Sequence, residues 1–288
     1  MNKDSLPNTF YHYCSTEAFL SIIQKKEIWL SHLILSNDSM EGKMARKAIE
    51  HLAKGDNLDE KIKNQLILCI DVLQDIYSGF GFCLSAEGDL LSQWRAYAAN
   101  GTGISIGFSR KFFTNIESES KFFGFEQVKY KDHEHNEIVR NTYNEIKKHI
   151  KCGAFKLFPQ KNYLSSQTEN DISKEKSNII NENESVITKL QKLFPMLYFL
   201  KSESFQEEKE WRLVSSFPIA ELYTDIQYRH NNNIILPYQV IKIDKPGESI
   251  DEIILGPKHE TPHKVIKNFL QNHGFKDTPI KPSKLSYR

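Results

Sequence analysis

The chain has 288 residues, of which 39% are hydrophobic and 11% aromatic, so it can bury a sizeable core. Lys and Arg total 38 against 37 for Asp and Glu, and this formal charge of +1 excludes a whole-protein field directed at nucleic acid or an anionic membrane. The four cysteines have neither CxxC nor zinc-site spacing, and no apolar run resembles a signal peptide or a membrane span. We therefore expect a folded cytoplasmic protein with reduced thiols, no metal and no membrane partner.

The N-terminal part predicts a strand, a helix and a second strand. Residues 9–15 (TFYHYCS) form a short aromatic strand pattern that carries His12 and is followed by an amphipathic helix pattern through residue 25. Ser15 or Thr16 is suited to cap that helix. A strand over 27–35, a loop and a helix to about residue 54 follow.

The middle of the chain alternates helices and strands. Apolar spacing predicts a helix over 58–77, and the helix predicted over 90–99 places Trp94 and Tyr97 on one face at i, i+3. The remaining patterns here predict strands over 80–85, 104–108 and 123–130, and a helix that starts at residue 110.

The composition of the chain changes after residue 130. Residues 131–200 are polar with long helical stretches, which predicts a helical insertion within a single α+β domain over 1–288. Beyond it the patterns predict strands over 234–243, 250–255 and 280–287, with a helix capped by Thr261 between the last two. The fold class predicted is α+β, with a mixed, mostly antiparallel central sheet flanked by helices.

The stretch 205–214 (FQEEKEWRLV) sets carboxylates and an arginine against an apolar run. If it is extended, Gln206, Glu208 and Glu210 share one face because side chains alternate along a strand. Two like charges at i, i+2 raise the proton affinity of at least one of them unless a cation or ligand lies between. The alternative interpretation is a charged edge strand with Trp211 packed beneath it.

Five motifs occur together in order: YHYCS, SNDSMEG, FCLSAEGDLLSQWRAYAANGTGISIGF, FQEEKEWRLV and DEIILGP. Their content and order resemble the bacterial family known as domain of unknown function 2971. The resemblance spans nearly the whole chain apart from the polar insertion. Cys14 and Ser39 depart from that family's usual threonine and proline. Neither departure removes a charged or imidazole side chain.

A strand with one His, an immediate helix and a late E-x-E strand are similar to the layout of ADP-ribosyltransferases. The similarity implies ADP-ribosyl transfer from NAD, or NAD hydrolysis, with NAD as the nucleotide substrate and a protein or nucleic acid as a possible acceptor. It also implies a role as a toxin or phage-defence effector. It also implies roles for particular residues: catalysis by Glu210, Glu208 and His12; NAD binding by His12, Tyr13, Ser15, Trp94 and Tyr97; substrate binding by Asn37, Asp38, Glu41, Gln206 and Arg212.

Two other functions stay open. In a metal-dependent nuclease or nucleic-acid-binding protein, Asp38, Glu41, Glu208 and Glu210 with Lys201 or Lys209 would hold a divalent ion and its substrate. In a non-catalytic sensor or partner-binding module, the acidic face would only recognise a basic ligand. Individual residues also have structural interpretations, since Asn37 and Asp38 suit a turn or cap, His12 a hydrogen-bonded core position, and Trp94 core packing.

Overall fold

The computed structural model describes residues 6–33, 41–159, 168–218, 226–231 and 233–287. The chain divides into two compact units. The sheet unit comprises Met1–Ser36, Gly79–Val128 and Ser202–Arg288, and the helical unit comprises Asn37–Ser78 and Lys129–Lys201. The predicted insertion, 131–200, therefore lies in the helical unit together with residues 37–78.

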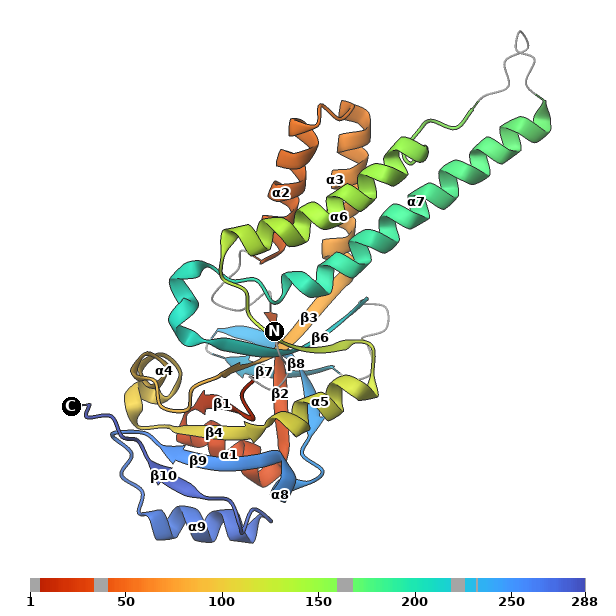
Figure 1. The fold of residues 1–288 in the computed structure, drawn as a ribbon. Coiled ribbons are helices and arrows are strands. Elements are labelled where there is room, and N and C mark those ends of the chain that lie inside the picture. The colour runs from red at the N-terminus through yellow and green to blue at the C-terminus, as the bar shows by residue number, and fades with distance from the viewer. Residues whose placement is uncertain (1–5, 34–40, 160–167, 219–225, 232, 288) are drawn as a thin grey trace. The chain divides into compact units, whose positions relative to one another are not determined.

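An open, mostly antiparallel sheet forms the sheet unit, as the sequence predicted (Figure 1). The described residues give ten strands, eight of them in the order β10-β9-β4-β1-β3-β2-β8-β7, while β6 pairs with β3 and β5. β9 and β10 are parallel. The strands are β1 (Thr9–Cys14), β2 (Glu27–His32), β3 (Tyr77–Ser85), β4 (Ile104–Ser109), β5 (Phe123–Gln127), β6 (Glu210–Pro218), β7 (Ile226–Asn231), β8 (Ile234–Lys242), β9 (Ile250–Leu255) and β10 (Ile280–Pro282).

Helices cover the sheet through apolar faces. The sheet unit contains α1 (Thr16–Lys25), α4 (Leu91–Tyr97), η3 (Ala99–Gly101), α5 (Arg110–Glu119), η4 (Glu203–Glu208), α8 (Pro246–Ser249) and α9 (His263–Asn272). The Ser15 side chain accepts a hydrogen bond from the Ala18 backbone N–H at 3.2 Å, so the predicted cap of α1 is confirmed. Pro262, rather than Thr261, occupies the cap position of α9, and no side chain caps it.

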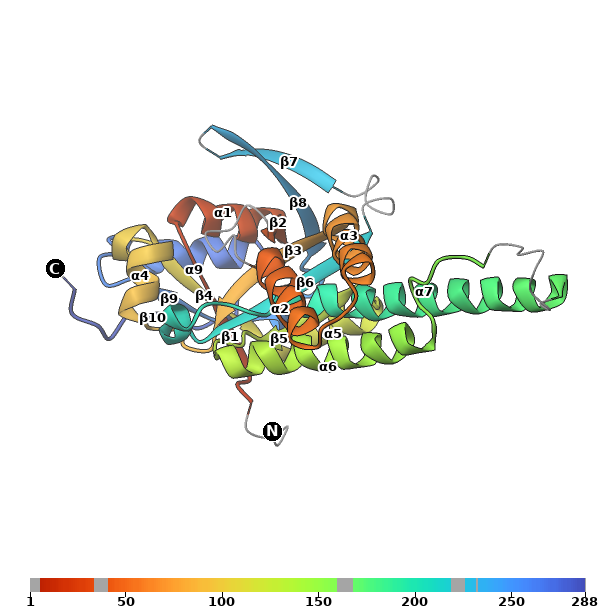
Figure 2. The same ribbon diagram turned by 90° about the horizontal axis from the view of Figure 1, so that it is seen from above.

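The main core lies on one face of the sheet. It combines apolar residues of α1, α5 and α9 with side chains of β1, β3, β4, β6 and β9 that point to that face. A smaller cluster on the other face of β1 joins Tyr13, Trp94, Ala98 and Ile254. α4 lies beside β1 in both views of the fold (Figures 1 and 2). The helix with Trp94 and Tyr97 is thus held on the face opposite the main core.

The helical unit has its own core. Its helices are α2 (Glu41–Gly55), α3 (Glu60–Ile76), α6 (Asp132–Cys152) and α7 (Glu169–Leu197), and α6 and α7 lie side by side (Figures 1 and 2). Thr168 and Asp171 form a reciprocal capping box that starts α7. Buried Leu, Ile and Val side chains of all four helices form one cluster. The polar composition of this region is therefore that of amphipathic helices with one apolar stripe each.

Candidate functional site

His12 packs against the main core. Its ring stacks on Phe82 with 4.2 Å between centroids, and its Nδ1 lies 2.9 Å from the Cys83 carbonyl oxygen. Because a carbonyl only accepts, Nδ1 carries the proton and Nε2 the lone pair. Burial lowers the pKa of His12 to about 4, and the hydrogen bond to Cys83, which favours the charged ring, opposes this only in part. His12 is therefore neutral near pH 7.

The aromatic residues predicted to line an NAD site divide into two groups. Trp94 is fully buried and packs edge-on against Tyr13 with 4.9 Å between ring centroids. Its Nε1 donates to Asp89 Oδ1 at 2.7 Å. Burial raises the pKa of the Tyr13 hydroxyl, which donates to the Glu87 carbonyl. Tyr97, by contrast, is 40% exposed.

The stretch 205–214 is not one extended strand. Residues 203–208 form the short helix η4, Lys209 adopts a left-handed conformation with φ of 47°, and the strand begins only at Glu210. Long-range hydrogen bonds fix this break, because Ser85 Oγ donates to the Glu208 carbonyl at 2.7 Å and Ala86 N–H donates to the Lys209 carbonyl at 2.9 Å. The predicted common face of Gln206, Glu208 and Glu210 is wrong for this reason.

Glu208 ends beside the exposed aromatic ring. Tyr97 Oη donates to Glu208 Oε1 at 3.0 Å, which joins residues 111 positions apart in the chain. Next to this contact Lys209 forms an ion pair with Glu87 at 2.9 Å, and both side chains are about half exposed. We call Glu87, Tyr97, Glu208 and Lys209 the α4 surface. It presents a carboxylate, a phenol ring and an ion pair to solvent.

Glu210 has the opposite environment. Its carboxylate contacts Arg212 at 2.7 Å from Nε and 3.3 Å from Nη2, and the two side chains are 5% and 3% exposed. Strand alternation points both away from Trp211, whose ring lies 4.7 Å from that of Phe10. Because Phe10 and His12 share a face of β1, His12 and Glu210 project to opposite faces of the sheet. We call Glu210 and Arg212 the buried pair.

The structure thus brings the predicted site residues together in pairs: Tyr13 with Trp94, Tyr97 with Glu208, and Glu210 with Arg212. It does not join His12 to Glu208 or Glu210. Ser15 caps α1, and Gln206 is exposed on η4. Asn37 and Asp38 lie outside the described residues. Glu41 begins α2, but its side chain also lies outside them.

Two residues not singled out from the sequence organise this region. Ser85 donates to the Glu208 carbonyl and accepts from the Glu87 backbone N–H, at 2.7 and 3.2 Å. Asp89 accepts from Trp94 Nε1, Ser283 Oγ and the Lys284 backbone N–H, all within 2.7 Å. Both belong to the FCLSAEGD segment, so the motif that supported the family resemblance contained the signal that would have identified them.

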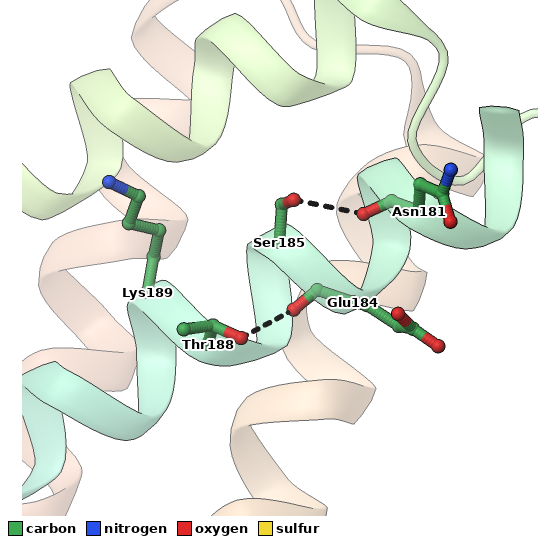
Figure 3. Close-up of a pocket in the computed structure, with 5 residues that line it drawn as sticks. All are labelled: Asn181, Glu184, Ser185, Thr188 and Lys189. Carbon is green, nitrogen blue, oxygen red and sulfur yellow. Dashed lines mark hydrogen bonds between the residues drawn. The ribbon is translucent and has the colours of Figure 1, made fainter.

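The helical unit has a shallow recess of about 380 Å³ along α7 (Figure 3). The hydroxyls of Ser185 and Thr188 donate to the carbonyls of Asn181 and Glu184 of the same helix, each at 2.9 Å, as the dashed lines show. These polar groups are satisfied within the helix, and none of the predicted site residues lines this recess.

Among the described residues, no group of three or more His, Cys, Asp or Glu side chains is placed to hold a metal ion.

Fold and site together define an α+β protein with an open, mostly antiparallel sheet and an acidic, aromatic surface around α4. Residues 93–213 match the family described as Protein of unknown function (DUF2971), which supports, over this part of the chain, the family predicted from the motifs. Tyr97, Glu208, Glu210 and Arg212 all lie in the matched segment. No curated protein and no solved structure matches the chain. None of the described helices is both long and apolar enough to cross a membrane.

Proposed function

We propose that the protein cleaves the nicotinamide–ribose bond of NAD and transfers ADP-ribose to water or to a macromolecular acceptor, with the α4 surface as its site. The observation that carries the proposal is the hydrogen bond between Tyr97 and Glu208, which holds an accessible carboxylate beside an accessible aromatic ring. These are the two groups that this chemistry requires at one place.

The chemistry gives each group a role. Loss of nicotinamide builds positive charge on the ribose C1′, and a carboxylate that accepts a hydrogen bond from the 2′-hydroxyl stabilises that charge. Glu208 takes this role because its carboxylate is reachable from solvent. The Tyr97 ring, 40% exposed, offers a stacking surface for the nicotinamide. The oxygen of water or of the acceptor then bonds to C1′ and releases its proton to solvent as nicotinamide leaves.

The other predicted residues receive supporting roles in this proposal. Glu210 is buried against Arg212, so it fixes the start of β6 and the orientation of η4 before it. His12 packs on Phe82 and donates to a backbone carbonyl, which assigns it to the core wall. Trp94 anchors α4 through Tyr13 and Asp89. Catalysis is thus assigned to Glu208 rather than to Glu210 or His12.

The test is nicotinamide release from NAD by the full chain, with and without a cell extract as a source of acceptors. Glu208→Gln should lower the rate about 100-fold or more, the usual loss when a transition-state charge partner is removed. Glu207→Gln is the matched control, because Glu207 is an exposed carboxylate on the same short helix. Full turnover by Glu208→Gln, or none by the wild-type protein in either condition, would refute the proposal.

The two alternatives give different results in the same assays. A nuclease would degrade RNA or DNA in the presence of Mg²⁺ or Mn²⁺ and leave NAD intact. A sensor would bind a ligand that protects it against unfolding but would turn nothing over. In both cases Glu208→Gln would have no effect on nicotinamide release.

A further inference from the structure

A second cluster of polar and aromatic side chains lies at the end of the sheet formed by β2, β8 and β7. The strand register pairs Ser31 with Tyr238 and Arg229 with Leu236, so these side chains share one face. Trp29 is on that face too, and its ring lies 4.4 Å from that of Tyr238. We call Trp29, Ser31, Arg229 and Tyr238 the Arg229 cluster. α4 packs on β1 instead, so this cluster is distinct from the α4 surface.

The Arg229 side chain extends from β7 across β8 to Ser31 on β2. Its Nη2 donates to Ser31 Oγ at 2.8 Å, and its Cζ lies 5.6 Å from the centroid of the Trp29 ring. Its Nε is buried and has no hydrogen-bond partner within the part of the chain that the structure describes. Among the described residues no carboxylate pairs with Arg229. Of the residues placed in the structure, one neutral hydroxyl is thus the hydrogen-bond partner of a permanent cation that is partly removed from water.

The surroundings add positive charge. Lys25 Nζ lies 4.6 Å from the centroid of the same Trp29 ring. The nearby carboxylate, Glu27, already forms an ion pair with Lys242 at 2.5 Å and accepts from Trp29 Nε1 at 2.9 Å. Among the described residues, Lys25 and Arg229 thus lie at the Trp29 ring, whereas Glu27 is paired directly with Lys242. The local field favours an anion.

Packing alone is a poor explanation of Arg229. A neutral long side chain would cover Trp29 without the cost of desolvating a charge. The attraction between the guanidinium and the indole offsets part of that cost but leaves Nε unsatisfied. An oxyanion bound to the guanidinium would supply a countercharge, and two of its oxygens would match the planar fork of N–H donors.

We propose that the Arg229 cluster is a binding site for the oxyanion of a small molecule, a phosphate monoester or a carboxylate. Arg229 binds two of its oxygens, Lys25 adds charge, and the half-buried Trp29 ring borders the space for the rest of the ligand. Ser31 holds the guanidinium in place.

Tryptophan fluorescence offers a direct probe, because Trp29 is half-buried whereas Trp94 and Trp211 are 0% and 7% exposed. We would titrate the full chain with inorganic phosphate, AMP and succinate at constant ionic strength, with chloride as the ionic control. A saturable change with at least one of the three is expected, and the one that binds tightest identifies the source of the oxyanion. Changes no larger than those with chloride for all three would overturn the proposal.

Variants locate the site. Arg229→Gln should weaken binding at least tenfold, and Arg229→Lys should weaken it less because charge remains without the fork. Arg140→Gln, which removes the same charge from an exposed position on α6, should leave binding unchanged. Equal affinities of the Arg229 and Arg140 variants would overturn the assignment. If Arg229→Gln does not fold, the comparison of Arg229→Lys with Arg140→Gln decides. Glu208→Gln should retain anion binding, so this result is independent of NAD turnover.

Discussion

Two carboxylates that lie two residues apart in the chain have different surroundings. Glu210 is 5% exposed and paired with Arg212, whereas Glu208 sits on a surface helix and accepts from the exposed Tyr97. The difference arises at Lys209, where a left-handed residue separates η4 from β6. A buried pair in this position stabilises the fold, whereas Glu208 is only partly buried and lies beside the Tyr97 ring. Sequence spacing alone therefore does not define a shared site.

The largest effect should come from breaking the buried pair. Glu210→Ala leaves the Arg212 charge without the carboxylate that it contacts at 2.7 Å, and we expect the free energy of unfolding to fall by about 3–5 kcal/mol. Urea unfolding at pH 7 measures this. Glu208→Ala is the control and should cost at most about 1 kcal/mol. Equal losses in the two variants would remove the distinction between the two carboxylates.

His12 extends the comparison to a neutral, partly buried group. Its pKa is lowered from 6.5 to about 4 in the folded protein. Between these values the unfolded chain binds more protons, so stability is fully present above pH 6.5 and is lost as the pH falls toward 4. The loss should approach about 3 kcal/mol at 1.36 kcal/mol per pKa unit. Urea unfolding from pH 7 to 4 should show a flatter pH dependence for His12→Phe, and an unchanged slope would contradict the burial of this ring.

Asp89 tests whether α4 is held from outside the helix. Asp89→Ala removes the acceptor of hydrogen bonds from Trp94, Ser283 and Lys284. We expect the free energy of unfolding to fall by about 2 kcal/mol. Hydrogen exchange should become faster in α4 and in residues 283–287. Asp277→Ala, at an exposed position, is the matched control. Unchanged exchange in both segments would mean that α4 is fixed by its apolar contacts alone.

The smallest effect on stability should come from the exposed pair. Tyr97→Phe removes one partly exposed hydrogen bond to Glu208, so the free energy of unfolding should change by less than about 1 kcal/mol. Nicotinamide release should fall only a few-fold because the ring stays, whereas Tyr97→Ala should lose most of the activity. Identical rates of nicotinamide release for the two variants would show that the Tyr97 ring is not part of the site.

Periodic apolar patterns predicted most of the fold. The strand and helix around His12, the α3 pattern and the helical region after residue 131 were confirmed, because burial of one face leaves a clear repeat in the sequence. The break at Lys209 was not predictable from local residues, since it depends on hydrogen bonds to Ser85 and Ala86, more than 120 positions away. β7 (Ile226–Asn231) was missed because it is a polar edge strand.

The candidate site was predicted in part. The motifs selected Tyr97 and Glu208, which the structure joins, but their contact depends on how α4 and η4 pack and not on spacing. His12 and Glu210 were selected by analogy to one layout, and strand alternation places them on opposite faces. Asp89 was overlooked because an acidic residue after a strand is ordinary turn chemistry until its partners near residue 283 are known.

The attachment of residues 283–287 to Asp89 and Asn100 has a consequence for biosynthesis. α4 is translated early, yet the segment that secures it is made 186 residues after Tyr97. At about 5–20 residues per second, a ribosome needs about 10–40 s to cover that interval. During translation the nascent chain therefore carries an unfinished α4 surface until residues 283–287 have been made and can bind to Asp89 and Asn100.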